Sequence, residues 1–192
     1  MTSYGMAYFL EDKTGLLTGS EYTDIHDRMK LVYRCTAKDS THTAYMIYNL
    51  SDTSTSRGSS TRPVIALDFG AGNSLGVISF GLGSGSGEEL KQVQMKKYLT
   101  KLSTLGSSKV RKFTGANGKE YTWRWKVKED QEWACTDAEG TLIAYYSLKL
   151  AGEPDYPHSS GCMLTVEEPY ADLASEMLAS LMIMRHIAAH NL

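Results

Sequence analysis

The sequence predicts a mainly β protein in which an antiparallel barrel or strongly curved sheet encloses one hydrophobic helix near the carboxyl end. Two observations support this fold class. Between residues 30 and 166 most apolar residues alternate with polar ones, which is the period of a half-buried strand. After residue 169 the period changes, and an apolar run without a polar face follows.

Composition indicates one soluble globular domain. The chain has 192 residues, of which 42% are hydrophobic and 22% charged, so collagen-like, coiled-coil and wholly disordered classes are excluded. Cys35, Cys135 and Cys162 form no C-x-x-C pair, which fits a reducing cytosol. The first ten residues lack the features of a signal peptide. We expect a cytoplasmic single domain over residues 1–192, with residues 1–27 as an N-terminal extension.

The first half of the chain predicts two hairpins. Alternation over 30–36 and 43–48 gives the first hairpin, and 64–69 with 75–80 gives the second, around the glycine-containing turn at 70–74. The polar stretch 51–62 predicts a mobile loop. The Gly/Ser stretch 81–88 predicts a flexible linker, because its glycines lack the spacing of a phosphate-binding loop. The residues just after it, 88–93, are compatible with a helix.

The second half predicts a meander. Strands are expected over 110–113, 119–127, 133–135, 141–148 and 162–166. Asn117 and Gly118 predict a type I′ hairpin turn, in which both residues have positive φ. In the strand that follows, the alternation places Tyr121, Trp123, Trp125 and Val127 on one buried face.

The carboxyl end predicts a buried helix over roughly 170–187. Pro169 suits a first helical position, and acidic residues near it complement the positive end of the helix dipole. The charge-free run from Met177 to Met184 is far shorter than the ~20 residues that a bilayer-spanning helix needs. We therefore expect this helix to be enclosed by strands.

Charge is segregated along the chain. Residues 91–128 contain eleven Lys or Arg and one acid, a net charge of +10, whereas residues 129–192 carry a net charge of −9. These segments could neutralise each other on one mixed surface. Alternatively, the basic segment could form a face for an anionic partner, or the two charges could meet between copies in a homodimer.

The motifs Phe113, Gly118-Lys119-Glu120-Tyr121-Thr122-Trp123, Ala144-Tyr145-Tyr146 and Met163-Leu164-Thr165-Val166 resemble a fungal domain family of unknown function. That family is grouped with the tubby C-terminal, LURP-one-related and phospholipid scramblase proteins. The resemblance implies a closed antiparallel barrel around a central hydrophobic helix and no catalytic residues. It also implies contact with lipid, because tubby proteins bind phosphoinositide headgroups and scramblases act at membranes.

Candidate headgroup-binding residues are the basic side chains of the central segment. Several lysines or arginines that converge near an anionic surface contribute about 1 kcal/mol each to binding. The candidates are Lys96, Lys97, Arg111, Lys112, Arg124, Lys126 and Lys128.

Metal binding and catalysis have weaker sequence support. His186 and His190 share a helix face at i and i+4 and could ligate a metal, but no third ligand is evident. No nucleophile elbow occurs, and Cys35 suits a small buried apolar residue. The sequence therefore favours a non-enzymatic binding or scaffold module without a cofactor, which acts on a protein partner. The alternative is reversible binding of anionic phospholipid headgroups through residues 91–128, at the membrane periphery. Nucleic acid is not an expected partner.

Overall fold

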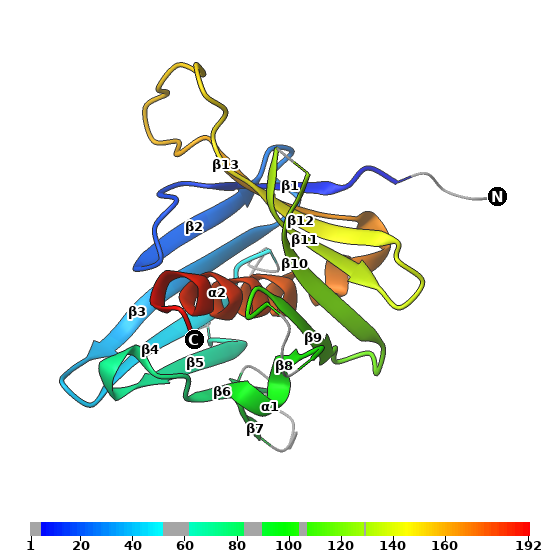
Figure 1. Cartoon of the computed structure of the whole chain (residues 1–192). Helices are drawn as coiled ribbons and strands as arrows, with labels where there is room; N and C mark the ends of the chain where they lie inside the picture. Colours follow the sequence, from blue (N-terminus) through cyan, green and yellow to red (C-terminus); the bar gives the residue numbers. More distant parts are fainter. Residues whose placement is uncertain (1–4, 52–61, 83–89, 104–106, 129) are drawn as a thin grey trace.

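The structure is a computed structural model that describes residues 5–51, 62–82, 90–103, 107–128 and 130–192 (Figure 1). The loop predicted over 51–62 and the linker predicted over 81–88 lie mostly outside these residues. The described residues form an antiparallel sheet of thirteen strands, two α-helices and two short 3-10 helices. This confirms a mainly β fold with a C-terminal helix.

The elements follow one another along the chain in a regular order. The first seven strands are β1 (Tyr8–Asp12), β2 (Gly19–Asp24), β3 (Lys30–Lys38), β4 (His42–Asn49), β5 (Ile65–Gly70), β6 (Val77–Phe80) and β7 (Lys91–Gln94). The remaining strands are β8 (Thr100–Lys101), β9 (Val110–Thr114), β10 (Glu120–Lys128), β11 (Gln131–Asp137), β12 (Leu142–Ser147) and β13 (Cys162–Val166). The helices are η1 (Ala71–Asn73), α1 (Met95–Tyr98), η2 (Glu168–Leu173) and α2 (Ala174–His190).

The sheet consists of two meanders joined at their outer strands. Its order is β7-β6-β5-β4-β3-β2-β1-β13-β12-β11-β10-β9-β8. Strands β1 and β13 pair in antiparallel register from Tyr8 opposite Val166 to Asp12 opposite Cys162. Neighbours within each meander are also neighbours in sequence, so this is the one pairing in the described sheet that joins distant parts of the chain.

The predicted closure of the barrel is not found among the described strands. The hydrogen-bonded ladder stops at β7 on one side and at β8 on the other, and no pairing of described residues joins these two edges. Helix α1 connects the edges directly, and the Met95 amide donates a hydrogen bond to the Gly76 carbonyl (2.8 Å). Four helical residues replace a strand at this point, which leaves a discontinuity that we call the seam.

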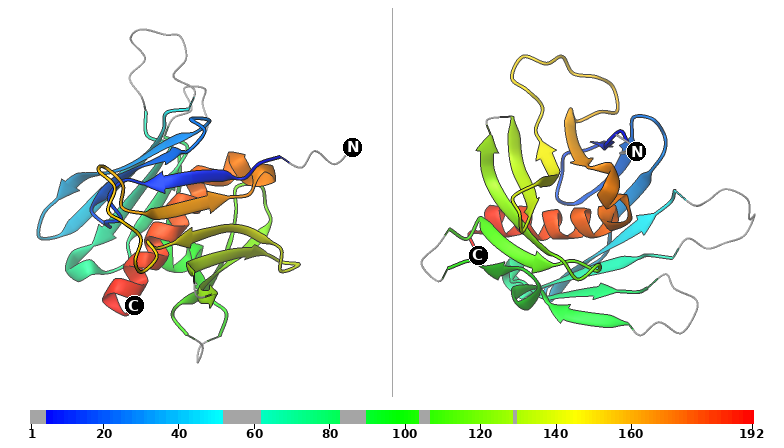
Figure 2. Two further views of the ribbon diagram at one scale, coloured as in Figure 1. Left: turned by 90° about the horizontal axis from the view of Figure 1, so that it is seen from above. Right: turned by 90° about the vertical axis from the view of Figure 1, so that its right-hand side faces the viewer.

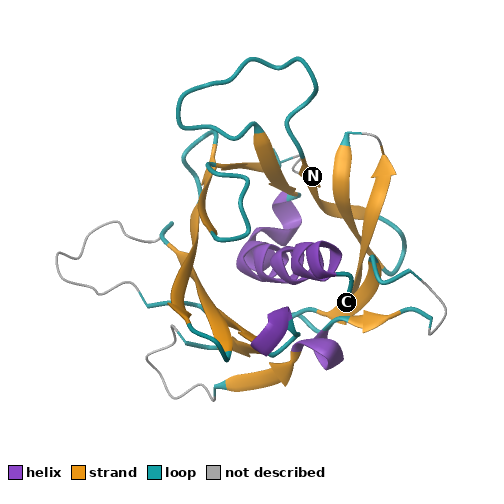
Figure 3. Ribbon diagram, turned by 60° about the vertical axis from the view of Figure 1, so that its left-hand side comes forward, coloured by secondary structure: helices purple, strands orange, loops and turns teal. Residues whose placement is uncertain are grey.

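Helix α2 lies inside the curved sheet, as predicted (Figures 2 and 3). Strands lie around the helix in Figure 3, and its side chains from Met177 to Met184 are at most 1% exposed. Burial of each large apolar side chain contributes about 1.5–3 kcal/mol. The helix therefore forms the centre of the hydrophobic core.

Two polar side chains on the buried helix have hydrogen-bond partners in β10, in α1 and in the β9–β10 turn. Trp123 donates its indole N–H to Ser180 Oγ (2.9 Å). Glu176 accepts hydrogen bonds from the Tyr98 hydroxyl and the Ala116 amide, both at 2.8 Å. Buried polar groups need such partners, and these contacts fix the rotation of the helix within the sheet.

Strand β10 departs from its predicted alternation near its end. Tyr121 and Trp123 are fully buried, but Trp125 is 38% exposed and Val127 is 56% exposed. The register against β11 shifts between Trp125 and Lys128, and Lys126 has a positive φ of 46°. This bulge ends the alternation, so the prediction that Trp125 and Val127 belong to the buried face was wrong.

Sequence periodicity also missed several local features. Strands β1 and β2 lie within the predicted N-terminal extension. Residues 88–93 were judged compatible with a helix, but the structure has strand β7 there, and the helix α1 begins after it. In the β9–β10 turn the Gly118 amide donates to the Gly115 carbonyl (2.9 Å). Only Gly118 of the predicted pair has positive φ there, so the turn is not type I′. No described helix is long and apolar enough to cross a membrane.

We expect Leu181→Asp to abolish soluble folding. Leu181 is fully buried in α2. An unpaired buried charge costs several kcal/mol, against a total stability of about 5–15 kcal/mol. Soluble yield and the melting temperature by circular dichroism test this expectation. Ala189→Asp, at an exposed position of the same helix, is the matched control. A Leu181→Asp protein that melts at the wild-type temperature would contradict the buried position of the helix.

Candidate functional site

The basic residues proposed from the sequence do not converge on one surface. Lys112 forms an ion pair with Glu120 (2.9 Å) on the outer face of β9 and β10. Arg124 donates a hydrogen bond to Thr136 Oγ1 (3.0 Å). Lys97 is exposed on α1. The remaining four candidates divide between the seam and the β10–β11 hairpin.

The seam contains a pocket of about 530 Å³ that includes two of these candidates, Lys96 and Arg111. Lys101, which lies opposite Arg111 in the β8–β9 ladder, lines the same pocket. Arg111 is only 4% exposed, so the expectation that it belongs to an open basic face was wrong. It stands two residues before the buried Phe113 and shares its inward-facing side of β9.

The β10–β11 hairpin carries an exposed apolar surface. Trp125 and Val127 are exposed at the end of β10, and Leu148 and Leu150, just after β12, are 42% and 55% exposed. The hairpin and the loop after β12 lie at the same end of the molecule (Figures 1 and 3). We use the name hairpin surface for these four residues together with Lys109, Lys126 and Lys128.

Lysines surround the apolar residues of this surface. Lys109 Nζ lies 3.5 Å from the centroid of the Trp125 ring, and Lys126 Nζ lies 5.0 Å from it. Lys128 is exposed at the end of β10. Lys126 and the two leucines line a hollow of about 740 Å³, together with Asp130 and Glu132. Cations above an indole face gain about 0.5–1 kcal/mol at exposed sites and hold the ring in place.

The basic and acidic segments do not neutralise each other through ion pairs within the described parts of the chain. Lys112 pairs with Glu120 inside the basic segment, and Lys149 pairs with Asp155 inside the acidic one. Arg185 faces Asp12 and Glu132 at 3.9–4.0 Å. The mixed surface considered from the sequence therefore does not form from direct contacts between these segments.

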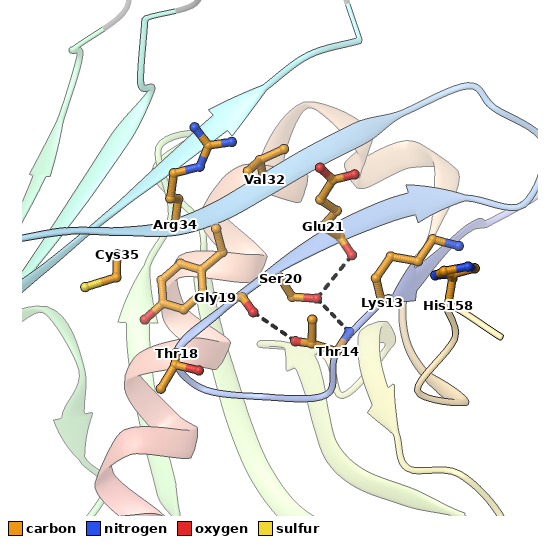
Figure 4. A pocket seen from close by; sticks show the side chains of 11 residues that line it. Lys13, Thr14, Thr18, Gly19, Ser20, Glu21, Val32, Arg34, Cys35 and His158 are labelled. Atoms are coloured by element: carbon orange, nitrogen blue, oxygen red, sulfur yellow. Dashed lines mark hydrogen bonds between the residues drawn. The ribbon is translucent and has the colours of Figure 1, made fainter. Parts of the chain in front are cut away.

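A third pocket, of about 640 Å³, lies where β3 extends past the start of β2 (Figure 4). Several polar groups that line it form hydrogen bonds with one another. Thr14 Oγ1 donates to the Gly19 carbonyl (2.8 Å), and the Thr14 amide donates to Ser20 Oγ (3.0 Å). Two charged lining residues, Lys13 and Glu21, have ion-pair partners in Glu11 and Lys30. Cys35 lines this pocket and is half-buried rather than buried.

Ser20, which lines this pocket, donates its hydroxyl to Asp12, the centre of a buried polar cluster. Its carboxylate accepts hydrogen bonds from the hydroxyls of Tyr22 (3.0 Å) and Tyr146 (2.8 Å). Burial is the main cause that raises the pKa of both phenols, so both keep their protons and remain donors. Arg185 stacks its guanidinium over the Tyr146 ring at 4.6 Å. The cluster ties α2 to β1, β2 and β12, which is a structural role.

The histidine pair does not form a metal site in the described residues. The rings of His186 and His190 lie 4.5 Å apart, and no group of three or more potential ligands gathers there or elsewhere in the described chain. His186 stacks on Phe69 at 4.0 Å, and its Nε2 lies 2.8 Å from the Asn73 carbonyl oxygen. His186 thus packs α2 against β5.

A family model described as "Family of unknown function (DUF6593)" matches residues 20–188. The chain belongs to this family. The match includes every residue of the seam pocket except Leu192 and the whole hairpin surface. It agrees with the expected membership of an unknown-function family, whereas the fungal and tubby-like parts of that expectation stay predictions. No curated protein and no solved structure matches the chain.

Sequence reasoning missed Lys101, Lys109 and the exposure of Trp125. The alternation rule, applied to Arg111 and Phe113, would have placed Arg111 inside. Lys101 stands on a two-residue strand that has no periodic signal of its own. Lys109 is significant only because β9 places it beside Trp125.

We expect the stability of the protein to fall as the pH drops below about 6.5, partly through His186. Burial is the main cause that lowers the pKa of His186 in the folded state. As the pH falls, His186 therefore binds a proton in the unfolded chain at a higher pH than in the folded one. The stability contributed by neutral His186 is present above its unfolded pKa and is lost as the pH falls below it. His186→Phe keeps the ring stack and should reduce the difference between melting temperatures at pH 7.5 and pH 5.5. His26→Gln, at an exposed position outside α2, is the control, and an unchanged difference in His186→Phe would refute the assignment.

Proposed function

We propose that this chain is a binding module without a catalytic role of its own, and that the hairpin surface is its contact site for a partner protein. The observation that carries the proposal is that four large apolar side chains are exposed at one end of the sheet, with Lys126 next to both pairs: it lies beside the Trp125 ring and lines the hollow with Leu148 and Leu150. Exposed apolar residues that cluster, rather than scatter, mark interaction sites.

The residue types support a protein partner. Tryptophan is enriched among the residues that dominate interface energetics, and Trp125 is prearranged beneath two lysines. The buried carboxylates of Asp12 and Glu176 accept hydrogen bonds from structural partners, which favours a binding role over a catalytic one. A partner segment with apolar and acidic side chains would complement this surface.

The second candidate is an anionic phospholipid surface. Trp125 with Lys109, Lys126 and Lys128 combines an amphipathic ring with cations, a combination suited to the boundary between headgroups and acyl chains. The sequence resemblance to the tubby-like group favours this candidate, and a sheet curved around a hydrophobic helix is compatible with it. A cytoplasmic location, and a monomeric or dimeric state, complete the proposal.

We expect Val127→Asp to weaken binding to either partner, because it places a negative charge among the lysines and removes apolar contact. A photo-crosslinking residue at position 127 should capture a defined protein in the source cells. Vesicles of phosphatidylcholine with and without phosphatidylserine test the second candidate by co-sedimentation, and binding to them should weaken with added salt.

Met6→Asp is the matched control, because Met6 is 53% exposed and Val127 is 56% exposed. Met6 precedes β1, at the end of the sheet opposite the hairpin. A protein contact is supported if a crosslinker at position 127 captures a protein and one at position 6 does not. The capture from position 127 should also be lost when the chain carries Trp125→Ala. Equal behaviour of Val127→Asp and Met6→Asp in both assays would overturn the proposal.

A further inference from the structure

The seam pocket differs from the other pockets in its charge. Its lining contains three basic side chains, Lys96, Lys101 and Arg111, and no Asp or Glu side chain. By contrast, the hairpin hollow and the β2–β3 pocket each include at least one carboxylate. Lys96 and Lys101 are exposed, and neither forms an ion pair with any residue that the structure describes.

Main-chain oxygens hold the Arg111 guanidinium in a fixed orientation, and no Asp or Glu side chain forms an ion pair with it among the described residues. It donates from Nε to the Ser108 carbonyl (3.1 Å), from Nη1 to the Leu99 carbonyl (3.3 Å) and from Nη2 to the Leu192 carbonyl (3.1 Å). A guanidinium has five N–H donors, so two remain after these contacts. No Asp or Glu side chain lines the pocket beside Arg111, so a bound anion would add a favourable charge interaction with this buried cation.

The fold explains why these cations meet. The sheet is interrupted between β7 and β8, and α1 crosses the interruption, so α1 places Lys96 and the short β8 places Lys101 at one opening. Arg111 approaches from the inner side of β9, opposite Lys101 in the ladder. Thr100 and Ser74 add hydroxyl groups to the lining.

We propose that the seam pocket binds a phosphate group, with Arg111 as the fixed donor and Lys96 and Lys101 as the exposed cations that close around it. Three positive charges suit a dianionic phosphate better than a singly charged carboxylate, and guanidinium and ammonium groups are the usual phosphate ligands in proteins. The volume of about 530 Å³ is in the range of small-molecule sites, so the phosphate belongs to a larger molecule. A soluble phosphomonoester and a phospholipid headgroup both supply this chemistry. The site is separate from the hairpin surface, so neither proposal depends on the other.

Calorimetric titration of the full chain with glycerol 3-phosphate tests the soluble source, with sodium chloride at matched ionic strength as the blank. Co-sedimentation with phosphatidylcholine vesicles that contain a phosphatidylinositol phosphate tests the lipid source. We expect saturable binding in at least one arm. The double variant Lys96→Gln with Lys101→Gln should weaken it by about tenfold or more, since it removes both exposed positive charges from the pocket lining.

Lys97→Gln is the matched control. Lys97 is the neighbour of Lys96 on α1 and is also exposed, but it does not line the pocket. This variant should bind within about twofold of the wild type, because a distant exposed charge acts only through screened electrostatics. All of these substitutions are at exposed positions, so folding should survive them, and an unchanged melting temperature verifies it.

Each outcome has a definite meaning. Loss of glycerol 3-phosphate binding in the double variant but not in Lys97→Gln supports a soluble phosphomonoester. The same difference seen only with vesicles supports a phospholipid headgroup. Absence of saturable binding in both arms, or equal losses in the double variant and in Lys97→Gln, would overturn the proposal.

Discussion

Enclosure of α2 is the constraint on which the rest of the structure depends. A helix whose side chains from Met177 to Met184 are all buried has no face to turn toward water, so the rest of the chain must enclose it. The sheet curves around it, and α1 crosses the gap between the two sheet edges. The polar atoms inside this enclosure are then obliged to find partners. Trp123 with Ser180, and Tyr98 with Glu176, meet this requirement and fix how the helix is rotated.

The sequence was sufficient where a single physical signal dominated. The all-round apolar run predicted the buried helix, and clear alternation predicted β3 to β6 and β9 to β13. The sequence was insufficient where tertiary contacts determine the local structure or the exposure of a side chain. Strand β7, Lys-Gln-Val-Gln, has one apolar residue and exists because β6 pairs with it. Trp125 satisfies the alternation, yet a bulge at Lys126 exposes it. The seam pocket could not be predicted, because Lys96 and Lys101 lie on a four-residue helix and a two-residue strand, which are too short to give a periodic signal.

Both candidate contact regions lie where the regular sheet stops. At the hairpin surface the register between β10 and β11 shifts at a bulge, and at the seam the hydrogen-bonded ladder ends at β7 and β8. Elsewhere in the described sheet, buried side chains share one core with α2, and each strand between β7 and β8 in the sheet order has a hydrogen-bonded neighbour on both sides. Interruptions of a sheet leave side chains and main-chain groups without neighbours, and these are the positions where a ligand or partner adds contacts without disturbing the core.

The order of elements along the chain has a consequence for biosynthesis. Every described strand precedes α2, and β13, which joins the two meanders through β1, comes just before it. A growing chain therefore carries two curved β surfaces with apolar concave faces before the helix that fills them has been made. Pairing β1 with β13 also closes a very long loop, which slows folding. The nascent protein thus passes through a stage in which its future core is exposed to solvent and to other chains, so its yield in a cell depends on whatever shields those faces until translation reaches α2.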